Sequence, residues 1–382
     1  MSLTLFPENA KQNAKLLLAF AKDKPLYFVL KANAYGHGLA AIAPRLVLLG
    51  EGRKTPPRFA VAKIKEALAF LSLLPRGLSY RPVLLLLSPV DDPLPLLAHP
   101  KRSLVELHFS VHSQEGALLL SRYAQKAKAE GLLPKEESVF CEIKIETGMH
   151  RLGFEEKAPL WTLFSLPSLS VCGLFSHLGN ADSPDSPKTA LQSRAFSRAA
   201  ERLYRRGLLP FTHLAASAAL LRHGFMGQSG ARTGLLLYGA SPFSPLSSLA
   251  DVPLPALLPV KRLSGRVLCV REVKRGESVG YGLRPLAADT RVAVLDVGYA
   301  EGLPPTALGA HALLHGRAVS LCGSVCMEKC FLDIGDLSVK EGDEAVFYGE
   351  SPKDTARFAA ECGLSPHALL ATGACANDCP SV

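Results

Sequence analysis

The chain of 382 residues is 48% hydrophobic and 20% charged, which predicts a folded protein with a large core and argues against extended disorder. Its formal net charge of +9 permits binding to nucleic acid, but the Lys and Arg residues are scattered and form no known nucleic-acid-binding pattern. Residues 1–8 lack the basic flank and apolar core of a secretion signal, and leucine-rich runs such as 83–87 are far shorter than a membrane span. We therefore expect a cytoplasmic globular protein with room for a barrel of roughly 250 residues and a second domain.

The cysteines point to a reducing compartment, because their number, nine, is odd and they form no disulfide framework. Cys322, Cys326 and Cys330 recur at every fourth residue, and Cys375 and Cys379 repeat that step. A metal or cluster site is one interpretation. However, gaps of three residues match zinc sites poorly, and no histidine follows at ligand spacing. We expect buried free thiols and no metal.

Strand-like and helix-like runs alternate from the start of the chain to residue 239. The strand-like runs are 26–30, 59–62, 83–87, 106–111, 140–145, 171–176 and 211–214, and the helix-like runs are 8–21, 39–49, 64–74, 115–130, a stretch near residue 160, and 190–206. Such alternation is typical of a parallel sheet. Roughly eight units favour a closed α/β barrel of the TIM type, (β/α)8, over residues 1–239.

The pattern of residue types changes after residue 239. A proline- and serine-rich segment, 240–259, predicts a linker with turns. Short β-branched runs follow at 266–273, 290–297, 318–321, 331–334 and 344–348, with helical character near 354–361 and after Pro366. Residues 240–382 are therefore expected to form a mainly β C-terminal domain.

Lys31 stands at the C-terminal end of the first strand-like run, the place where barrel enzymes carry their chemistry. A lysine there forms a Schiff base with an aldehyde if burial or a neighbouring cation lowers its pKa. Tyr35, four residues later, is within reach of a phosphate in such a site. The alternative is an ordinary lysine whose amine lies in water.

Later strand ends carry further polar residues. Arg151, on a glycine-bounded loop after Lys144, suits a carboxylate ligand, the alternative being a surface arginine. His177 directly follows a strand, where a hydrogen-bonded core histidine is the alternative to a catalytic one. Ser217 opens a helix and can donate to a phosphate or simply cap the helix. Gly234 lets backbone amides approach a phosphate closely.

The segment Lys31-Ala32-Asn33-Ala34-Tyr35-Gly36-His37-Gly38 resembles the cofactor-lysine segment of alanine racemases, which are fold-type III enzymes that use pyridoxal 5'-phosphate (PLP). Further segments are similar to motifs of that family and occur in the expected order: 147–153, 176–182, 230–239, 279–282, 296–302 and 326–328. The resemblance covers nearly the whole chain. It implies a PLP-binding barrel and a homodimer with shared active sites.

The resemblance implies two proton-carrying residues on opposite faces of the cofactor. Lys31 would serve the D face, and Tyr281, between two glycines, would reach from one subunit into the other's site to serve the L face. A phenol acts as a base only if nearby positive charge lowers its pKa. The expected relay runs from Tyr281 through His177 to Arg232.

The remaining roles also follow from the resemblance. Arg232 would face the pyridine nitrogen, and because arginine keeps its proton, the ring would be a weaker electron sink that restrains transamination and elimination. The phosphate contacts would come from Tyr35, Ser217, Gly234 and Leu235. The substrate contacts would come from Arg151, which binds the carboxylate, the amide of Met327, Tyr299 at the entrance, and Lys144, which is carbamylated in some members.

Four features depart from the family pattern. Ala216 and Glu328 stand where members usually have asparagine and aspartate. The amino terminus starts directly before the first helix, without the strand that members donate to the second domain. Residues 371–380 lack the usual tyrosine, so a second tyrosine contact to the phosphate is expected to be missing. Weaker cofactor retention would follow.

The resemblance implies an alanine racemase activity that interconverts L- and D-alanine and supplies D-alanine for peptidoglycan. One alternative is a racemase of broader specificity, acting for example on serine, through changes around Tyr299 and Met327. A second is a PLP-binding protein without turnover, against which the β domain with Tyr281 argues. Nucleic-acid binding, the third, predicts strongly salt-dependent association with random DNA.

Overall fold

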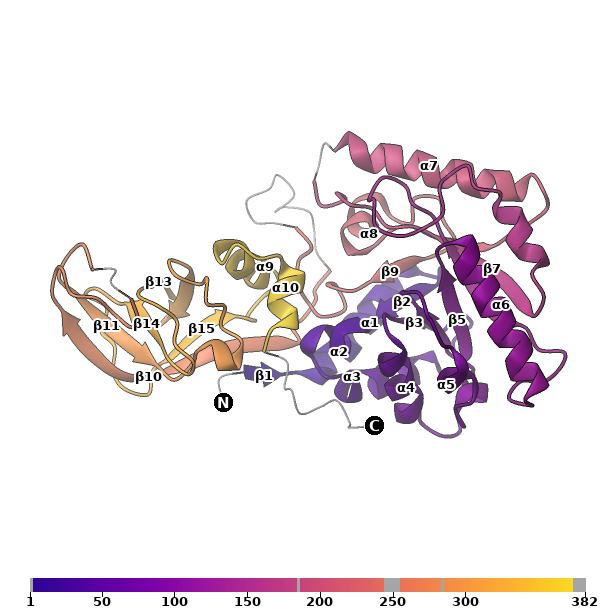
Figure 1. Ribbon diagram of the computed structural model, residues 1–382. Coiled ribbons are helices and arrows are strands. Elements are labelled where there is room, and N and C mark those ends of the chain that lie inside the picture. The colour runs from indigo at the N-terminus through magenta and orange to yellow at the C-terminus, as the bar shows by residue number, and fades with distance from the viewer. Residues whose placement is uncertain (1–2, 184–185, 244–254, 283–284, 374–382) are drawn as a thin grey trace.

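A computed structural model describes residues 3–183, 186–243, 255–282 and 285–373, which form two sheets with their helices (Figure 1). The first sheet has eight parallel strands in the order β8-β7-β6-β5-β4-β3-β2-β9. They are β2 Leu26–Val29, β3 Arg58–Val61, β4 Val83–Leu86, β5 Glu106–Val111, β6 Val139–Lys144, β7 Leu169–Phe175, β8 Phe211–His213 and β9 Ala231–Thr233. A parallel bridge between His213 and Gly230 joins the two edge strands. The sheet is therefore a nearly closed barrel, and the TIM-type prediction is confirmed.

The helices of the first domain lie around this barrel (Figure 1). They are α1 Pro7–Ala21, α2 Lys31–Gly36, α3 Leu39–Val47, α4 Ile64–Leu73, α5 Leu94–Leu97, α6 Gln114–Ala129, α7 Pro187–Tyr204 and α8 Ser217–His223, with the 3-10 turns η1 Leu48–Gly50, η2 Arg102–Leu104 and η3 Leu160–Ser165. The strands are buried between barrel interior and helices, so they read as continuous apolar runs rather than alternating ones. That explains why most of their positions follow from the sequence.

The second sheet is antiparallel, as the β-branched runs predict, and has its own hydrophobic core. Its strand order is β1-β10-β11-β14-β13-β12-β15, and β10 also pairs with β15. The elements are β1 Leu3–Leu5, β10 Lys261–Val273, β11 Thr290–Leu295, η4 Tyr299–Glu301, β12 His311–Leu314, β13 Arg317–Leu321, β14 Cys330–Asp333, β15 Glu344–Tyr348, α9 Pro352–Glu361 and α10 Pro366–Ala371. The predicted division at residues 239 and 240 falls between β9 and β10, and it stays a prediction.

The expectation that the amino terminus lacks a strand of the second domain is wrong. Strand β1 pairs antiparallel with the start of β10, with Leu3 opposite Leu263 and Leu5 opposite Lys261. Three residues are too few to show a strand periodicity, so only the pairing partner reveals this element. Strand β12, His311–Leu314, was also missed, because it contains no β-branched residue and forms through its pairing with β13 and β15. Within the described ranges, every helix is too short or too polar to cross a bilayer.

Candidate active site

Four of the predicted site residues lie at one end of the barrel because parallel strands share their direction. Lys31 follows β2, Lys144 ends β6, His177 follows β7, and Arg232 lies in β9. Burial, and then the charges of Arg151 and Arg232, lower the pKa of Lys31. The same causes, with the charge of Lys31, lower the pKa of Lys144 to about 8. The barrel mouth is therefore strongly positive and holds two lysines that lose their protons more readily than ordinary ones.

Helix α2 places the side chains after Lys31 in an unusual way. Residues Ala32–Tyr35 have φ angles between +52° and +55°, so they form a left-handed turn. This conformation costs roughly 1–2 kcal/mol per non-glycine residue. Hydrogen bonds hold it: the Ala32 amide donates to Glu66 Oε1 at 2.5 Å, and the Leu39 amide donates to Asn33 Oδ1 at 2.7 Å. Strain of this kind is typical of functional sites.

A small cradle lies where Tyr35 meets the segment after β9. The Gly234 amide donates to Ser217 Oγ at 3.2 Å, and a Cβ on Gly234 would lie 2.4 Å from Tyr35 Oη. The Tyr35 ring is stacked on Tyr238 at 4.9 Å. The buried Thr233 hydroxyl has no hydrogen-bond partner in the described part of the chain. A hydroxyl, a phenol and a glycine amide that converge on one place fit a phosphate group.

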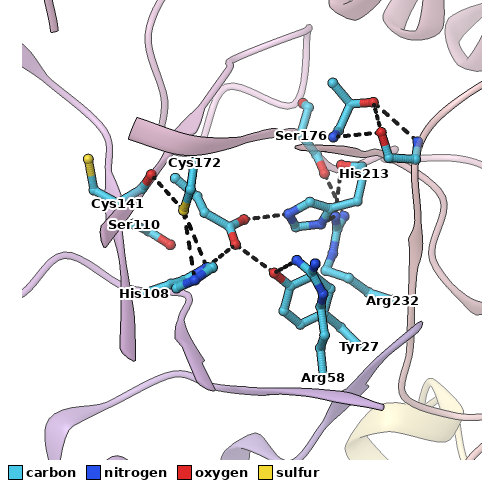
Figure 2. A network of polar contacts seen from close by, with 12 residues as sticks. Tyr27, Arg58, His108, Ser110, Cys141, Cys172, Ser176, His213 and Arg232 are labelled. Atoms are coloured by element: carbon cyan, nitrogen blue, oxygen red, sulfur yellow. Dashed lines mark hydrogen bonds and ion pairs between the residues drawn. The ribbon is translucent and has the colours of Figure 1, made fainter. Parts of the chain in front are cut away.

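Several hydrogen bonds fix the side chain of Arg232 in the site (Figure 2). Its Nη2 donates to the carbonyls of Ser176 at 2.5 Å and Leu214 at 3.1 Å, and its Nη1 lies 2.5 Å from His213 Nδ1. A guanidinium has no acceptor, so His213 Nδ1 accepts and is unprotonated. Burial lowers the pKa of Arg232 only to about 10, so it keeps its charge at neutral pH.

His177 lies next to this guanidinium, with its Nδ1 3.4 Å from Arg232 Nη2. Burial, followed by the charges of Arg232 and Arg151, holds the pKa of His177 well below its usual range. The imidazole is therefore neutral at the pH of a cell. A neutral imidazole can pass a proton between neighbours without carrying a charge of its own.

A buried carboxylate stands behind the site, and the sequence analysis missed it. Glu142 is fully buried; its Oε2 lies 2.6 Å from His213 Nε2, and its Oε1 accepts from the Tyr27 hydroxyl at 2.6 Å. Gly173 leaves room for it, since a Cβ there would lie 2.7 Å from Glu142 Cδ. Because strand side chains alternate, a charge two residues before Lys144 also points into the barrel. The separation of two residues between Glu142 and Lys144 could therefore have identified this carboxylate from the sequence.

His108 completes the buried network from β5. Its Nδ1 lies 2.7 Å from Glu142 Oε1 and its Nε2 lies 2.8 Å from Glu106 Oε1, so both nitrogens donate and the ring is an imidazolium. Burial alone would lower its pKa, but hydrogen bonds with Cys172, Glu106 and Glu142 outweigh burial and raise the pKa well above the usual range. The Cys172 sulfur lies 3.5 and 3.8 Å from the two nitrogens. Side chains of His108, Glu142 and Cys172 thus lie within 4.8 Å, an arrangement explained by these hydrogen bonds.

His112 is a second residue that the sequence analysis missed. It directly follows β5, and neither ring nitrogen has a hydrogen-bond partner in the described part of the chain. Burial, followed by the charges of Lys144 and Arg151, lowers its pKa to about 4. A buried imidazole with two unused nitrogens fits a site that takes a polar ligand. Its position after a strand was the signal, the same one that identified His177.

The structure does not bring the second-domain residues to Lys31 within one chain. Tyr281 is 75% exposed, Met327 57% and Tyr299 45%. These residues lie close to one another instead. The Tyr299 amide donates to the Cys326 carbonyl at 3.0 Å, and the Ser324 hydroxyl donates to the Tyr281 carbonyl. Of the predicted relay, one chain therefore supplies the pair His177 and Arg232.

The remaining predictions concern Arg151 and the cysteines. Arg151 is exposed on a loop that Glu146 holds by accepting from the amides of residues 148–150. Buried free thiols were expected; Cys330 is one, whereas Cys322 and Cys326 are free thiols that are only partly buried. Cys375 and Cys379 lie outside the described residues.

Comparisons with known proteins match this chain to one family over nearly its whole length. The N-terminal domain of alanine racemases matches residues 7–242, and their C-terminal domain matches residues 260–374. The alanine racemase of Yersinia pestis bv. Antiqua (strain Angola) is 33% identical over 94% of this chain and 92% of its own length. That of Clostridium tetani (strain Massachusetts / E88) is 30% identical over 89% of this chain and 83% of its own.

A solved structure leads to the same family. The biosynthetic alanine racemase from Pseudomonas aeruginosa superposes with a TM-score of 0.78 at 29% identity, and the match covers 97% of this chain and 96% of that one. The resemblance inferred from the motifs is therefore confirmed. The sequence and the two-domain fold of this chain together show that it belongs to the alanine racemase family, a family of PLP-dependent isomerases.

Proposed function

We propose that this chain is an alanine racemase that holds PLP on Lys31 and interconverts L- and D-alanine. The observation that carries the proposal is a lysine of lowered pKa at the barrel mouth, close to a charged Arg232 and to the cradle of Tyr35, Ser217 and Gly234. A PLP phosphate fits that cradle. The two unused nitrogens of His112 add polar groups on the side of Lys144.

The residues of the chain would share the chemistry as follows. Lys31, neutral more often than an ordinary lysine, would condense with the aldehyde of PLP and release water. Bound PLP withdraws electrons from an amino acid attached to it and so acidifies its Cα proton. Arg232 would donate to the ring nitrogen without giving up its proton, which limits that withdrawal and favours racemisation over side reactions. The amino group of the substrate would displace Lys31 from the cofactor, and the freed amine of Lys31 would then exchange the proton on the D face.

The second proton carrier in this proposal is Tyr281 of a partner subunit, on the L face. Its high exposure, together with the absence of any contact to Lys31 or His177 among the described residues of one chain, supports a homodimer with shared sites. The exposed neighbours Tyr299 and Met327 would enter with it. Tyr299 would then limit substrate size, and the Met327 amide and Arg151 would bind the substrate carboxylate. Lys144 would orient Arg151.

The experiment is an absorbance titration of the purified protein with PLP, followed by borohydride reduction and peptide mapping. We expect a visible band that borohydride bleaches and a label on Lys31. Lys144 is a built-in control, because its pKa is also lowered. A label on Lys144, or no band, would overturn the proposal. Racemisation rates on alanine, serine and lysine would then separate an alanine racemase from an enzyme of broader specificity.

We also propose that the protein works in the bacterial cytoplasm and supplies D-alanine for peptidoglycan. The relatives named above are bacterial alanine racemases. The seven cysteines of the described residues are all free, which suits a reducing compartment. Loss of the gene is expected to make growth depend on added D-alanine.

A further inference from the structure

Helix α10 of the second domain lies against helix α2 of the barrel (Figure 1). It brings His367 to Tyr35, with the two ring centroids 5.9 Å apart and the planes tilted by 41°. Tyr35 thus has Tyr238 stacked on it at 4.9 Å, Gly234 at its hydroxyl, and an imidazole beside it. The second domain therefore reaches the phosphate cradle of its own chain.

The backbone fixes this position of α10. Gly36 has a φ of +73°, and a Cβ there would lie 2.6 Å from the Leu370 carbonyl oxygen, so the two helices touch where only a glycine fits. Lys261 Nζ donates to the carbonyls of Leu370 at 2.6 Å and Thr372 at 3.1 Å at the end of α10. The location of the His367 ring is thus set by the close packing of α10 against α2.

The His367 ring is available to a ligand. It is exposed in the single chain and makes no hydrogen bond within the described residues. The charged or titratable groups around it are Lys31 and Tyr35 from α2 and Asp182 from the loop after β7, with Lys261 at the far end of α10. Partial burial, and then the charge of Lys31, lower the pKa of His367, whereas Asp182 raises it.

We propose that His367 is a cofactor-binding residue that donates a hydrogen bond to the phosphate of PLP from beside Tyr35. The inference rests on the proposed function, since it needs PLP on Lys31. It gives the chain a second side chain at the phosphate where the expected C-terminal tyrosine is missing. A charged donor to a phosphate is also stronger than a phenol.

A proton linkage follows from the charges. The phosphate of bound PLP would add an anion beside His367, and a neighbouring anion favours the charged form of an imidazole. The pKa of His367 is therefore higher in the loaded protein than in the free one, and a proton is taken up from solvent on binding. The gain in affinity is complete below the free pKa and is lost as the pH rises through the loaded pKa.

The test compares PLP with pyridoxal, which lacks the phosphate, over a range of pH. For His367→Phe, which keeps an aromatic ring beside Tyr35 but has no donor, we expect affinity for PLP to fall about 10- to 100-fold near neutral pH, since a hydrogen bond to a charged group is lost. Affinity for pyridoxal should be unchanged. His367→Tyr should restore most of the PLP affinity without its pH dependence. His223→Phe, an exposed histidine on α8, is the matched control and should behave as the wild type.

The outcomes are separable. Equal losses for PLP and pyridoxal in His367→Phe, or no loss for either, would overturn the role at the phosphate. If His367→Phe fails to fold, His367→Gln, which keeps a neutral donor, should lose the pH dependence and only part of the affinity. A wild type that forms no reducible bond to Lys31 would instead contradict the proposed function itself.

Discussion

At the scale of single residues, Lys144 is a lysine whose charge can change near neutral pH. It lies among the cations Lys31, Arg151 and Arg232, and its pKa of about 8 leaves about a tenth of it neutral at pH 7. A neutral amine reacts with carbon dioxide to give a carbamate, which carries a negative charge. Such a charge would relieve the repulsion among the neighbouring cations and give Arg151 a partner.

We therefore expect Lys144 to be carbamylated in bicarbonate buffer, with occupancy that rises as the pH passes about 8. Carbon-13 NMR with labelled bicarbonate measures it. Lys144→Met should lose the signal, and Lys31→Met should keep it. A signal that persists in Lys144→Met would place the modification elsewhere.

Residue types alone could predict much of the site at this scale. Lys31 and His177 follow from their places at strand ends, whereas Arg232 was expected only from the family resemblance; the structure brings all three to one end of the barrel. His112 and Glu142 were equally accessible by position but belong to no motif that the sequence analysis recognised. The pairing of Glu142 with His213 depends on the register of three strands, which a single sequence does not specify.

At the scale of elements, α2 is the piece that pattern reading could not describe. The residue types of Ala32–Tyr35 do not predict four positive φ angles, because Ala and Tyr favour the right-handed region. Contacts from distant parts of the chain impose the turn: Glu66 from α4, Tyr238 after β9, and α10. Long helices and most barrel strands, by contrast, lie within a few residues of their predicted runs, since their patterns are local, whereas the three-residue strand β9 has no predicted counterpart.

Gly36→Ala tests how tightly α2 and α10 are locked. The new Cβ would meet the Leu370 carbonyl at 2.6 Å and would also have to adopt a φ of +73°. We expect a loss of about 2–4 kcal/mol in the free energy of unfolding, measured by urea denaturation. Gly52→Ala is the matched control, because its φ is +68° with open space around it. Equal losses in both variants would show that the packing against α10 contributes nothing.

The buried network of β2, β5, β6 and β8 predicts a pH-dependent stability. His108 has a raised pKa, so its contribution is complete below its ordinary pKa of about 6.5 and is lost as the pH rises through the higher folded value. Glu142 has a lowered pKa, so its contribution is present above its ordinary value and is lost on acidification. The folded state should therefore be most stable between these two limits.

The variant His108→Leu should remove the loss of stability at alkaline pH that His108 causes. It leaves Glu142 with one partner fewer, so the unfolding free energy at neutral pH should fall by about 3–5 kcal/mol. The alkaline decline seen in the wild type should become shallower, as measured by denaturation at several pH values. An unchanged alkaline slope would mean that other groups cause it.

At the scale of the whole molecule, the proposed active site needs two chains. Lys31→Ala and Tyr281→Ala should each be inactive. Mixed in equal amounts and allowed to exchange subunits, they should regain about a quarter of wild-type activity, because half the dimers are mixed and each has one intact site out of two. Activity and oligomeric state are measured together. A mixture that stays inactive despite exchange would contradict a site shared between subunits.

The second domain is formed by two separate stretches of the sequence. Strand β1 precedes the barrel but pairs with Lys261–Leu263 in the second sheet. A fragment that begins at β10 would therefore expose an open strand edge, and such edges recruit other molecules. We expect that fragment to aggregate on expression. Fusing Leu3–Leu5 back to it through a flexible linker would give a soluble product, so a dissection of this enzyme has to treat its first residues as part of its last domain.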